Sequence, residues 1–155
     1  YRALVLWSPS ASNGDAAIAR SFGGAARFAE LAAQANAQGF VPYETDWGQK
    51  QQLSGRWFAD LAASRPADAL AAFAGDLLVL YGDADEVIDP ALMHAAALGA
   101  PAARSVQEII LPAARHGLGL FSEDPASVAR AVSETARFLT EHLAAAVPAE
   151  VSAGP

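Results

Sequence analysis

Three short runs of apolar residues stand out along the chain, and each is bounded by turn-forming residues. They extend from Ala3 to Trp7, from Leu77 to Tyr81 and from Val106 to Leu111. Their apolarity is continuous rather than alternating, which is typical of strands that are buried on both faces in a parallel sheet covered by helices. We therefore predict three strands of one parallel sheet.

The segment between the first two predicted strands is rich in helix-forming residues. An Ala-rich stretch at about residues 16–37 is expected to be a helix, with Asn13 or Asp15 as its N-cap and Gly39 at its end. A second helix is expected at about residues 57–73, interrupted near Pro66. This part of the chain is thus predicted to be a helical insert.

Two further helices follow the second and third strands. The first begins with Asp89 as N-cap and Pro90 at the first helical position, and ends at Gly99. The second covers about residues 125–145, where apolar residues recur with a period of 3.6. The tail at residues 148–155 is small and polar, and we expect it to be disordered.

The alternation of strands and helices predicts a three-layer α/β/α architecture with a parallel sheet. In such sheets the functional sites gather at the carboxyl ends of the strands. The residues that directly follow Trp7, Tyr81 and Leu111 are therefore the first candidates for chemistry.

Composition narrows the class of protein. The chain has 155 residues, of which 53% are hydrophobic and 17% charged, so it suffices for one globular domain. A net charge of −7 without a basic run argues against binding of nucleic acid. No uncharged apolar run approaches the roughly 18 to 20 residues that span a bilayer, so we expect no membrane contact. The absence of cysteine excludes disulfides and thiolate chemistry, and it leaves the compartment open.

The chain starts with Tyr1, directly before the first predicted strand. A chain whose first residues already lead into a strand is typical of a sequence that starts inside a domain. We therefore expect further sequence before Tyr1.

Titratable residues follow the second and third strands. The second strand leads into Gly82-Asp83-Ala84-Asp85, and the third leads into Pro112-Ala113-Ala114-Arg115-His116-Gly117. This pattern resembles the acid and histidine loops of the α/β-hydrolase superfamily, in which a strand runs into Gly-x-x-Asp and a later strand ends before a His. The resemblance covers residues 3 to 145 and is greatest to the branch of feruloyl esterases, dienelactone hydrolases and prolyl-oligopeptidase-like enzymes, where a strand ending in a turn such as Ser8-Pro9 precedes an insert.

The resemblance implies a catalytic role for Asp85 and His116. Asp85 would accept a hydrogen bond from the His116 ring and stabilise its imidazolium, and His116 would be the general base that takes the proton of a serine. The other interpretations are a loop carboxylate that caps a turn and a surface histidine. Asp83 is the nearest competitor of Asp85, but we expect it to be a solvated turn residue.

The serine itself has no match at the expected place. The superfamily's Gly-x-Ser-x-Gly elbow, upstream of acid and base, does not occur in the chain, so the oxyanion hole should be missing with it. The chain would then supply the last three strands of an eight-stranded plan. Ala19-Arg20-Ser21-Phe22-Gly23 fits an Ala-x-Ser-x-Gly variant, but a nucleophile elbow needs a buried strand directly before it. We therefore do not expect Ser21 to be the nucleophile.

Other residues are better explained by packing or capping. His94 and His142 are expected to be surface or packing residues, and no spacing of histidines, carboxylates or thiolates indicates a metal site. The aromatic residues of the predicted insert either line an acyl or aryl pocket beneath a lid, with a flexible polar stretch from Gly48 to Gly55, or pack as a core; they are Tyr43, Trp47, Trp57 and Phe58.

The predicted domain is the C-terminal part of an α/β-hydrolase at residues 1–147, with an insert or cap at about 13–72. The predicted function is a serine hydrolase of carboxylic esters that acts through an acyl-enzyme and needs no cofactor. The chain alone is expected to be inactive unless another polypeptide supplies the serine half, and its expected partners are a small-molecule ester and the missing N-terminal half of the same fold or a second copy. The alternative is a non-catalytic module that pairs through its exposed strand edge. Other reactions of the fold, such as those of haloperoxidases, dehalogenases or thioesterases, stay open.

Overall fold

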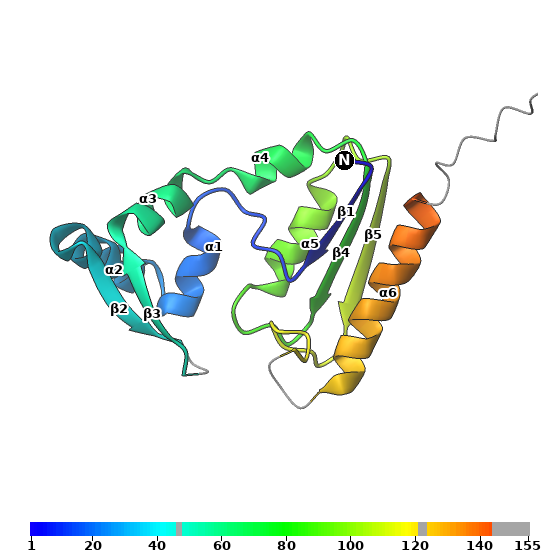
Figure 1. Cartoon of the computed structure of the whole chain (residues 1–155). Coiled ribbons are helices and arrows are strands. Elements are labelled where there is room, and N and C mark those ends of the chain that lie inside the picture. The colour runs from blue at the N-terminus through cyan, green and yellow to red at the C-terminus, as the bar shows by residue number, and fades with distance from the viewer. Residues whose placement is uncertain (46–47, 121–123, 144–155) are drawn as a thin grey trace, which may run out of the picture.

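The computed structural model describes residues 1–45, 48–120 and 124–143. A three-stranded parallel sheet, in the order β1-β4-β5, forms its centre. Its strands are β1 (Ala3–Trp7), β4 (Asp76–Gly82) and β5 (Ser105–Leu111). Helix α5 (Pro90–Leu98) covers one face and α6 (Pro125–Leu143) covers the other, as Figure 1 shows. This is the predicted three-layer arrangement, and all three strands lie where the apolar runs predict them.

The central strand β4 organises both layers of the core. All seven of its residues are buried. Because successive side chains point to opposite faces, Leu77, Val79 and Tyr81 lie in the core beneath α5. Leu80 belongs to a second core with Ala131 of α6. The continuous apolarity of this run is thus explained by burial on two faces.

The outer strands differ from this expectation. In β5 the side chains of Val106 and Ile110 are exposed by 43% and 47%, and all residues of β1 are only partly buried. Both strands are edges of the sheet within the described residues, so fewer neighbours cover them. Apolarity predicts a strand correctly here but overstates its burial.

Both C-terminal helices begin as predicted. The Asp89 carboxylate accepts a hydrogen bond from the Ala91 N–H at 2.9 Å and caps α5, which ends at Gly99. Asp124 caps α6 in the same way by accepting from the Ser127 N–H. Trp7 donates its ring N–H to the Thr135 hydroxyl at 2.9 Å and so fastens β1 to α6.

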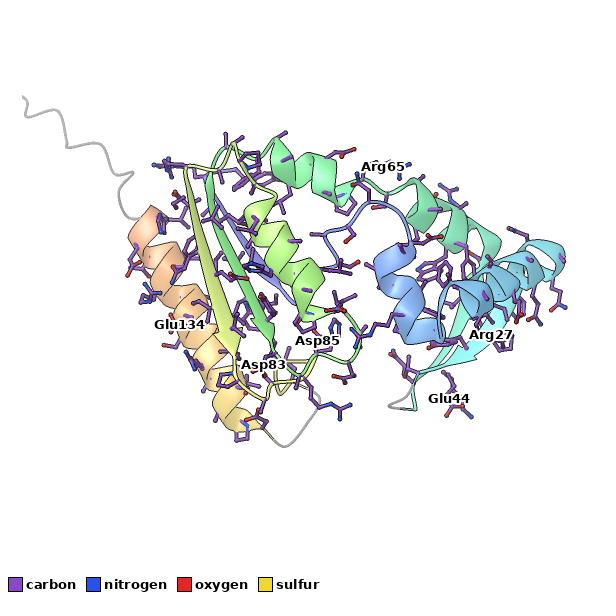
Figure 2. All side chains as sticks on the ribbon, turned by 180° about the vertical axis from the view of Figure 1, so that it is seen from behind. Arg27, Glu44, Arg65, Asp83, Asp85 and Glu134 are labelled. Atoms are coloured by element: carbon purple, nitrogen blue, oxygen red, sulfur yellow. The ribbon has the colours of Figure 1, made fainter. Side chains whose placement is uncertain are left out.

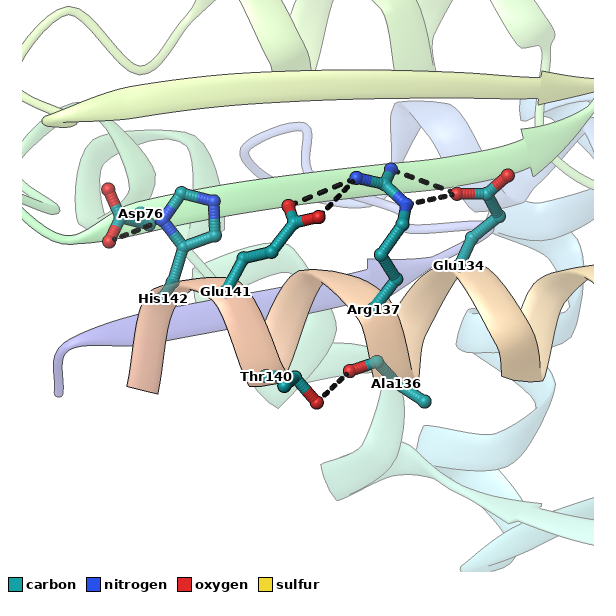
Figure 3. Close-up of polar contacts among 7 residues, drawn as sticks. All are labelled: Asp76, Glu134, Ala136, Arg137, Thr140, Glu141 and His142. Atoms are coloured by element: carbon teal, nitrogen blue, oxygen red, sulfur yellow. Dashed lines mark hydrogen bonds and ion pairs between the residues drawn. The ribbon is translucent and has the colours of Figure 1, made fainter. Parts of the chain in front are cut away.

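An ion-pair cluster fastens α6 at the end of the sheet where β4 begins. The carboxylate of Asp76 is buried and contacts Arg104, the Ser105 hydroxyl and the ring of His142. Figure 3 shows His142 reaching Asp76 from the last turn of α6, beside the exposed pairs that Arg137 makes with Glu134 and Glu141. The His142 ring also packs on Phe138 with centroids 4.4 Å apart. His142 is therefore a packing residue, as expected.

The segment between β1 and β4 forms a separate lobe beside the sheet, joined to it by α4 along one side (Figure 1). The lobe consists of several helices and one antiparallel pair of strands. Its elements are α1 (Ala16–Ala19), the 3-10 helix η1 (Arg20–Phe22), α2 (Ala25–Gln38), β2 (Phe40–Glu44), β3 (Lys50–Ser54), α3 (Gly55–Ala63) and α4 (Pro66–Ala71).

The predicted helix at residues 16–37 is broken, and its expected caps act differently. Gly23 and Gly24 have φ of 86° and 102°, a left-handed backbone that ends η1 before α2 begins. Asp15 stands at the N-cap of α1 without a side-chain capping bond. The Asn13 amide oxygen instead accepts from the Ala67 and Asp68 N–H groups, so Asn13 caps the distant helix α4.

The interpretation of residues 48–55 as a flexible polar stretch is wrong, because most of it is strand β3. Leu53 is buried, while Lys50 and Gln52 are exposed. One face of the β2-β3 pair packs on helices and the other meets water, so few of its residues need to be apolar. That polar alternation hides the strand from a search for apolar runs.

The aromatic residues of the lobe pack against one another. Phe22 stacks on Tyr43 with centroids 4.4 Å apart, and Phe28 contacts both Trp57 and Phe58. With Leu31, Val41 and Leu53 they form a core that is distinct from the two cores at the sheet. This arrangement favours the core interpretation of these aromatics over the pocket interpretation.

Some predictions fall on residues outside the described ranges: Trp47, the end of the last helix at 144–145 and the tail at 148–155. Among the described residues, none of the helices combines the length and the apolarity that crossing a bilayer requires.

Candidate active site

Asp85 lies in the loop that follows β4, at the carboxyl end of the sheet, where Figure 2 shows it near Asp83. Its Oδ1 atom accepts hydrogen bonds from the N–H groups of Val87 at 2.9 Å and of Ile88 at 2.8 Å. The side chain is 0% exposed. The loop thus folds around its own carboxylate and fixes its orientation.

His116 comes from the loop after β5 and meets this carboxylate. Its Nδ1 atom lies 2.9 Å from Oδ2 and 3.2 Å from Oδ1 of Asp85. An ionised carboxylate only accepts hydrogen bonds, so Nδ1 carries the proton and donates it. In the neutral imidazole the Nε2 atom is then left with a lone pair that can take up a proton. The His116 side chain is 33% exposed.

The charge of Asp85 is maintained in spite of its burial. Burial raises the pKa of a carboxyl group, but here the hydrogen bond from His116 and those from the Ile88 and Val87 N–H groups outweigh it. The pKa of Asp85 therefore lies below its ordinary value.

The acid and histidine loops are joined directly through their main chains. A Cβ atom at Gly82 would overlap the carbonyl group of Ala114, so only glycine allows the loops to approach this closely. The Ala84 N–H donates to that same carbonyl at 3.2 Å. The Asp83 carboxylate accepts a hydrogen bond from the Ala113 N–H at 2.6 Å. Ala113 itself has a left-handed φ of 58°, which is uncommon for a residue other than glycine.

A second pair of charges links the two loops at their tips. Glu86 forms an ion pair with Arg115 at 2.8 Å and accepts a hydrogen bond from the main-chain N–H of His116. Burial alone would raise the pKa of Glu86, but hydrogen bonds from its own main-chain N–H, from the N–H of His116 and from Arg115 hold that pKa below the ordinary value. The sequence carries a signal for this contact, because two consecutive acids meet a consecutive Arg and His. The predicted site includes neither Glu86 nor Arg115.

Two serines deserve comparison with the expected nucleophile. Ser21 lies in η1, directly after α1 rather than after a strand, and its hydroxyl donates to the Ile18 carbonyl at 2.8 Å. Ser8 does follow a strand and has a positive φ of 41°. Its hydroxyl is buried and has no hydrogen-bond partner among the described residues. Neither serine therefore has the strand, turn and helix of a nucleophile elbow around an accessible hydroxyl.

The remaining candidate residues have structural partners. Asp83 is exposed in its turn, and Asp89 caps α5. His94 lies at the surface, where its Nδ1 atom is 3.0 Å from the Glu108 carboxylate. Within the ranges that the structure describes, no cluster of three or more histidines and carboxylates could hold a metal ion.

No protein-family model and no curated protein matches this sequence. Solved structures do match its fold. Est1E from Butyrivibrio proteoclasticus aligns with 92% of this chain at a TM-score of 0.56 and 17% identity, and with a TM-score of 0.58 and 19% identity in its complex with ferulic acid. A monoacylglycerol lipase from Paleococcus ferrophilus aligns with 90% of the chain at a TM-score of 0.66 and 13% identity.

The esterase RhEst1 from Rhodococcus sp. ECU1013 also matches, over 90% of the chain at a TM-score of 0.54 and 19% identity. The chain spans 50% to 59% of the length of these proteins. All of them are built on one fold, and this chain shares it over nearly all of its own length. The chain thus has the α/β-hydrolase fold and corresponds to about half the length of its structural neighbours.

Proposed function

We propose that this chain supplies the acid and the general base of a serine hydrolase that cleaves carboxylic esters. The observation that carries this proposal is the contact between the buried Asp85 carboxylate and Nδ1 of His116, at the carboxyl end of two neighbouring parallel strands. The structural neighbours named above include an esterase and a monoacylglycerol lipase, which makes esters the first class of substrate to test.

In this mechanism His116 takes the proton of a serine hydroxyl through Nε2 while the serine attacks the ester carbonyl. Asp85 stabilises the resulting imidazolium, and the ring then gives the proton to the leaving alcohol. In the second half of the reaction His116 takes a proton from water, the water attacks the acyl-enzyme, and the ring returns the proton to the serine as the carboxylic acid leaves. Because no Gly-x-Ser-x-Gly elbow occurs in these 155 residues, the serine and the oxyanion hole have to come from an N-terminal half of the same fold, supplied by further sequence or by another polypeptide.

We further propose that residues 1–147 are one part of a hydrolase domain and that residues 13–72 are an insert in it. The separate aromatic core of the lobe supports this division. The insert contacts the acid loop through Arg20, whose guanidinium lies 3.6 Å from the carboxylate of Asp89. Both side chains are about half exposed, so this pair contributes little to stability.

A fluorophosphonate probe, which labels activated serines, tests the proposal. We expect no labelling of the 155-residue chain, and labelling of one serine outside it in the protein isolated from its native source. The His116→Ala variant of that protein should abolish the labelling, whereas the His94→Ala variant, which changes a surface histidine, should preserve it. Labelling of Ser8 or Ser21, or labelling that persists without His116, would contradict the proposal.

One observation favours the alternative of a binding module. The outer edge of β1 is unpaired among the described residues, and beside it lies an apolar pocket of about 340 Å³ whose lining includes Leu4, Leu6 and Phe73. Unpaired strand edges readily accept another strand. Size-exclusion chromatography with hydrogen exchange at residues 4–7 tests this alternative, since a monomer with rapid exchange there would argue against edge pairing.

A further inference from the structure

Two consecutive carboxylates of the acid loop hold two different parts of the same histidine. Asp85 accepts from the His116 ring, with 2.9 Å between Oδ2 and Nδ1. Glu86 accepts from the main-chain N–H of His116, with 3.3 Å between Oε2 and N. A ring held at one atom can still turn with its backbone. The second contact removes that freedom, because it fixes the backbone from which the ring extends.

The second contact depends on Arg115. Its guanidinium lies 2.8 Å from Oε1 of Glu86, so the two oxygens of this carboxylate face two different donors. Glu86 is 37% exposed and Arg115 is 68% exposed. An ion pair this open adds little to the stability of the fold. Its consequence is geometric, because it orients the Glu86 carboxylate toward the neighbouring N–H.

The histidine loop needs such a hold. Ala113, which starts the turn toward His116, has a left-handed φ of 58°. This backbone conformation is energetically unfavourable for any residue that has a side chain. At the start of this turn Asp83 accepts from the Ala113 N–H. At its tip only Glu86 accepts from the main chain of His116 among the described residues. The loop is therefore anchored at two points, one on each side of the approach between Gly82 and Ala114.

We propose that Glu86, oriented by Arg115, is a positioning residue that keeps the His116 ring on Asp85. This inference rests on the proposed function, in which that ring is the general base. Glu86 itself touches no reacting atom. It acts on the orientation of the base and thereby on the fraction of molecules in which Nδ1 stays bonded to Asp85.

The test uses the 155-residue chain itself and needs no catalysis. In the chain labelled with ¹⁵N at histidine, NMR spectroscopy measures how fast the Nδ1 proton of His116 exchanges with water. In Glu86→Ala we expect exchange to become faster by up to about tenfold, the factor that corresponds to one ordinary net hydrogen bond. Glu86→Gln, which keeps an acceptor oxygen but not the charge, and Arg115→Ala should give smaller increases.

Glu134→Ala is the matched control, because it removes another partly exposed Glu–Arg pair on α6, far along the chain from both loops. It should leave the exchange rate of the His116 proton unchanged. An equal increase in Glu134→Ala and Glu86→Ala, or a lower melting temperature of Glu86→Ala with unchanged exchange, would overturn the inference. Either result would show that Glu86 does not position the ring. It would not bear on the proposed function, which depends on the contact between Asp85 and His116.

An Asp85→Asn background separates the two proposals further. If Glu86 acts through the Asp85–His116 bond, Glu86→Ala has no additional effect on the exchange of the ring proton once that bond is gone. A chain in which the native pair shows no protected Nδ1 proton would overturn both proposals, because there would be no pair to position.

Discussion

The buried carboxylate of Asp85 has little freedom to rearrange, since main-chain N–H groups hold one oxygen and His116 meets the other. A carboxylate held in this way serves as a fixed acceptor. The tautomer of the ring follows from it, because only a proton on Nδ1 fits a charged acceptor. A single buried side chain thus determines which nitrogen of His116 is free for chemistry.

The variant Asp85→Asn should destabilise the chain in a pH-dependent way. The pKa of Asp85 is lower in the folded chain than its ordinary value of about 4, so its ionised form stabilises the fold above that pH, and this contribution is lost as the pH falls. Near pH 7 we expect a loss of about 1–3 kcal/mol in the free energy of unfolding, typical of a broken hydrogen bond to a buried charge.

Urea unfolding of both proteins at neutral pH and at about pH 3 measures this difference, which should shrink in acid. An equal difference at both pH values would show that the charge of Asp85 contributes nothing. The same sign applies to Asp76, whose pKa is held well below its ordinary value chiefly by its hydrogen bond with Arg104. We therefore expect the Asp76 cluster to add to the loss of stability in acid.

A methyl group at residue 82 should separate the two loops. Because a Cβ there would overlap the Ala114 carbonyl, we expect Gly82→Ala to lower the free energy of unfolding by about 1–3 kcal/mol, as overpacking does. We also expect faster exchange of the His116 ring proton. Gly99→Ala is the control, since Gly99 has an ordinary φ of −79° and its nearest contact would be 3.1 Å away. A similar cost at both positions would argue against a specific loop contact at Gly82.

Among the elements, capping shows most clearly how side chains far apart in sequence cooperate. Asn13 lies just before α1 in the chain, yet its amide oxygen bonds the first N–H groups of α4. Its Nδ2 group also donates to Asp68 at 2.7 Å. One residue thereby attaches the start of the lobe to the helix that leads back to the sheet.

The variant Asn13→Ala should cost about 1 kcal/mol, the usual effect of losing an N-cap. The loss should appear as faster amide exchange at residues 67–70. Asp15→Ala is a close control, because Asp15 stands at a formal N-cap without a capping bond. We expect it to change stability by less than about 0.5 kcal/mol. If the two variants behaved alike, the distant cap would be of no energetic importance.

The sequence predicts the elements of the sheet better than those of the lobe, for a physical reason. β4 is covered on both faces and reads as a continuous apolar run, and α5 carries its Asp-Pro start and its Gly end in the sequence. β3 buries only one of its faces, and its residues other than Leu53 are polar or small. The break between η1 and α2 depends on positive φ at Gly23 and Gly24, which a count of helix-forming residues overlooks.

The same limit applies to the site. The loops that carry Asp85 and His116 could be recognised because each directly follows an apolar strand. The contacts of Gly82 with Ala114 and of Glu86 with Arg115 could not be predicted from spacing along the chain, because each joins residues about thirty positions apart. They depend on the register of β4 with β5, which only the folded sheet supplies.

On the scale of the whole molecule, the lobe and the sheet have separate cores with few connections. The lobe is centred on Phe28, Phe58 and Leu31, and none of these belongs to the cores of the sheet. The connections include Leu70 of α4, which is buried in the core beneath α5, the Arg20–Asp89 pair and Ile18, which packs at the edge of both cores. We therefore expect the lobe to open independently of the sheet.

The variant Phe58→Ala tests this independence. Removing a buried aromatic side chain typically costs about 3–5 kcal/mol, and here the loss should be confined to the lobe. Hydrogen exchange should accelerate at β2 and β3 while the amides of β4 and the His116 ring proton stay protected. Ala131→Gly, in the core between the sheet and α6, should instead accelerate hydrogen exchange in β4 and leave that of β2 and β3 unchanged. Uniform acceleration in both variants would show a single cooperative unit.

Strand β4 begins at Asp76, inside the ion-pair cluster, and ends at Gly82, against the histidine loop. A slip of this strand by one residue against its neighbours would therefore be penalised at both ends together: the charges at Asp76 would lose their partners, and a residue with a side chain would replace glycine beside Ala114. It would also turn each apolar side chain to the opposite face of the sheet. The sheet consequently favours one alignment, so a change in the geometry of Asp85 and His116 has to come from their loops rather than from movement of the strand.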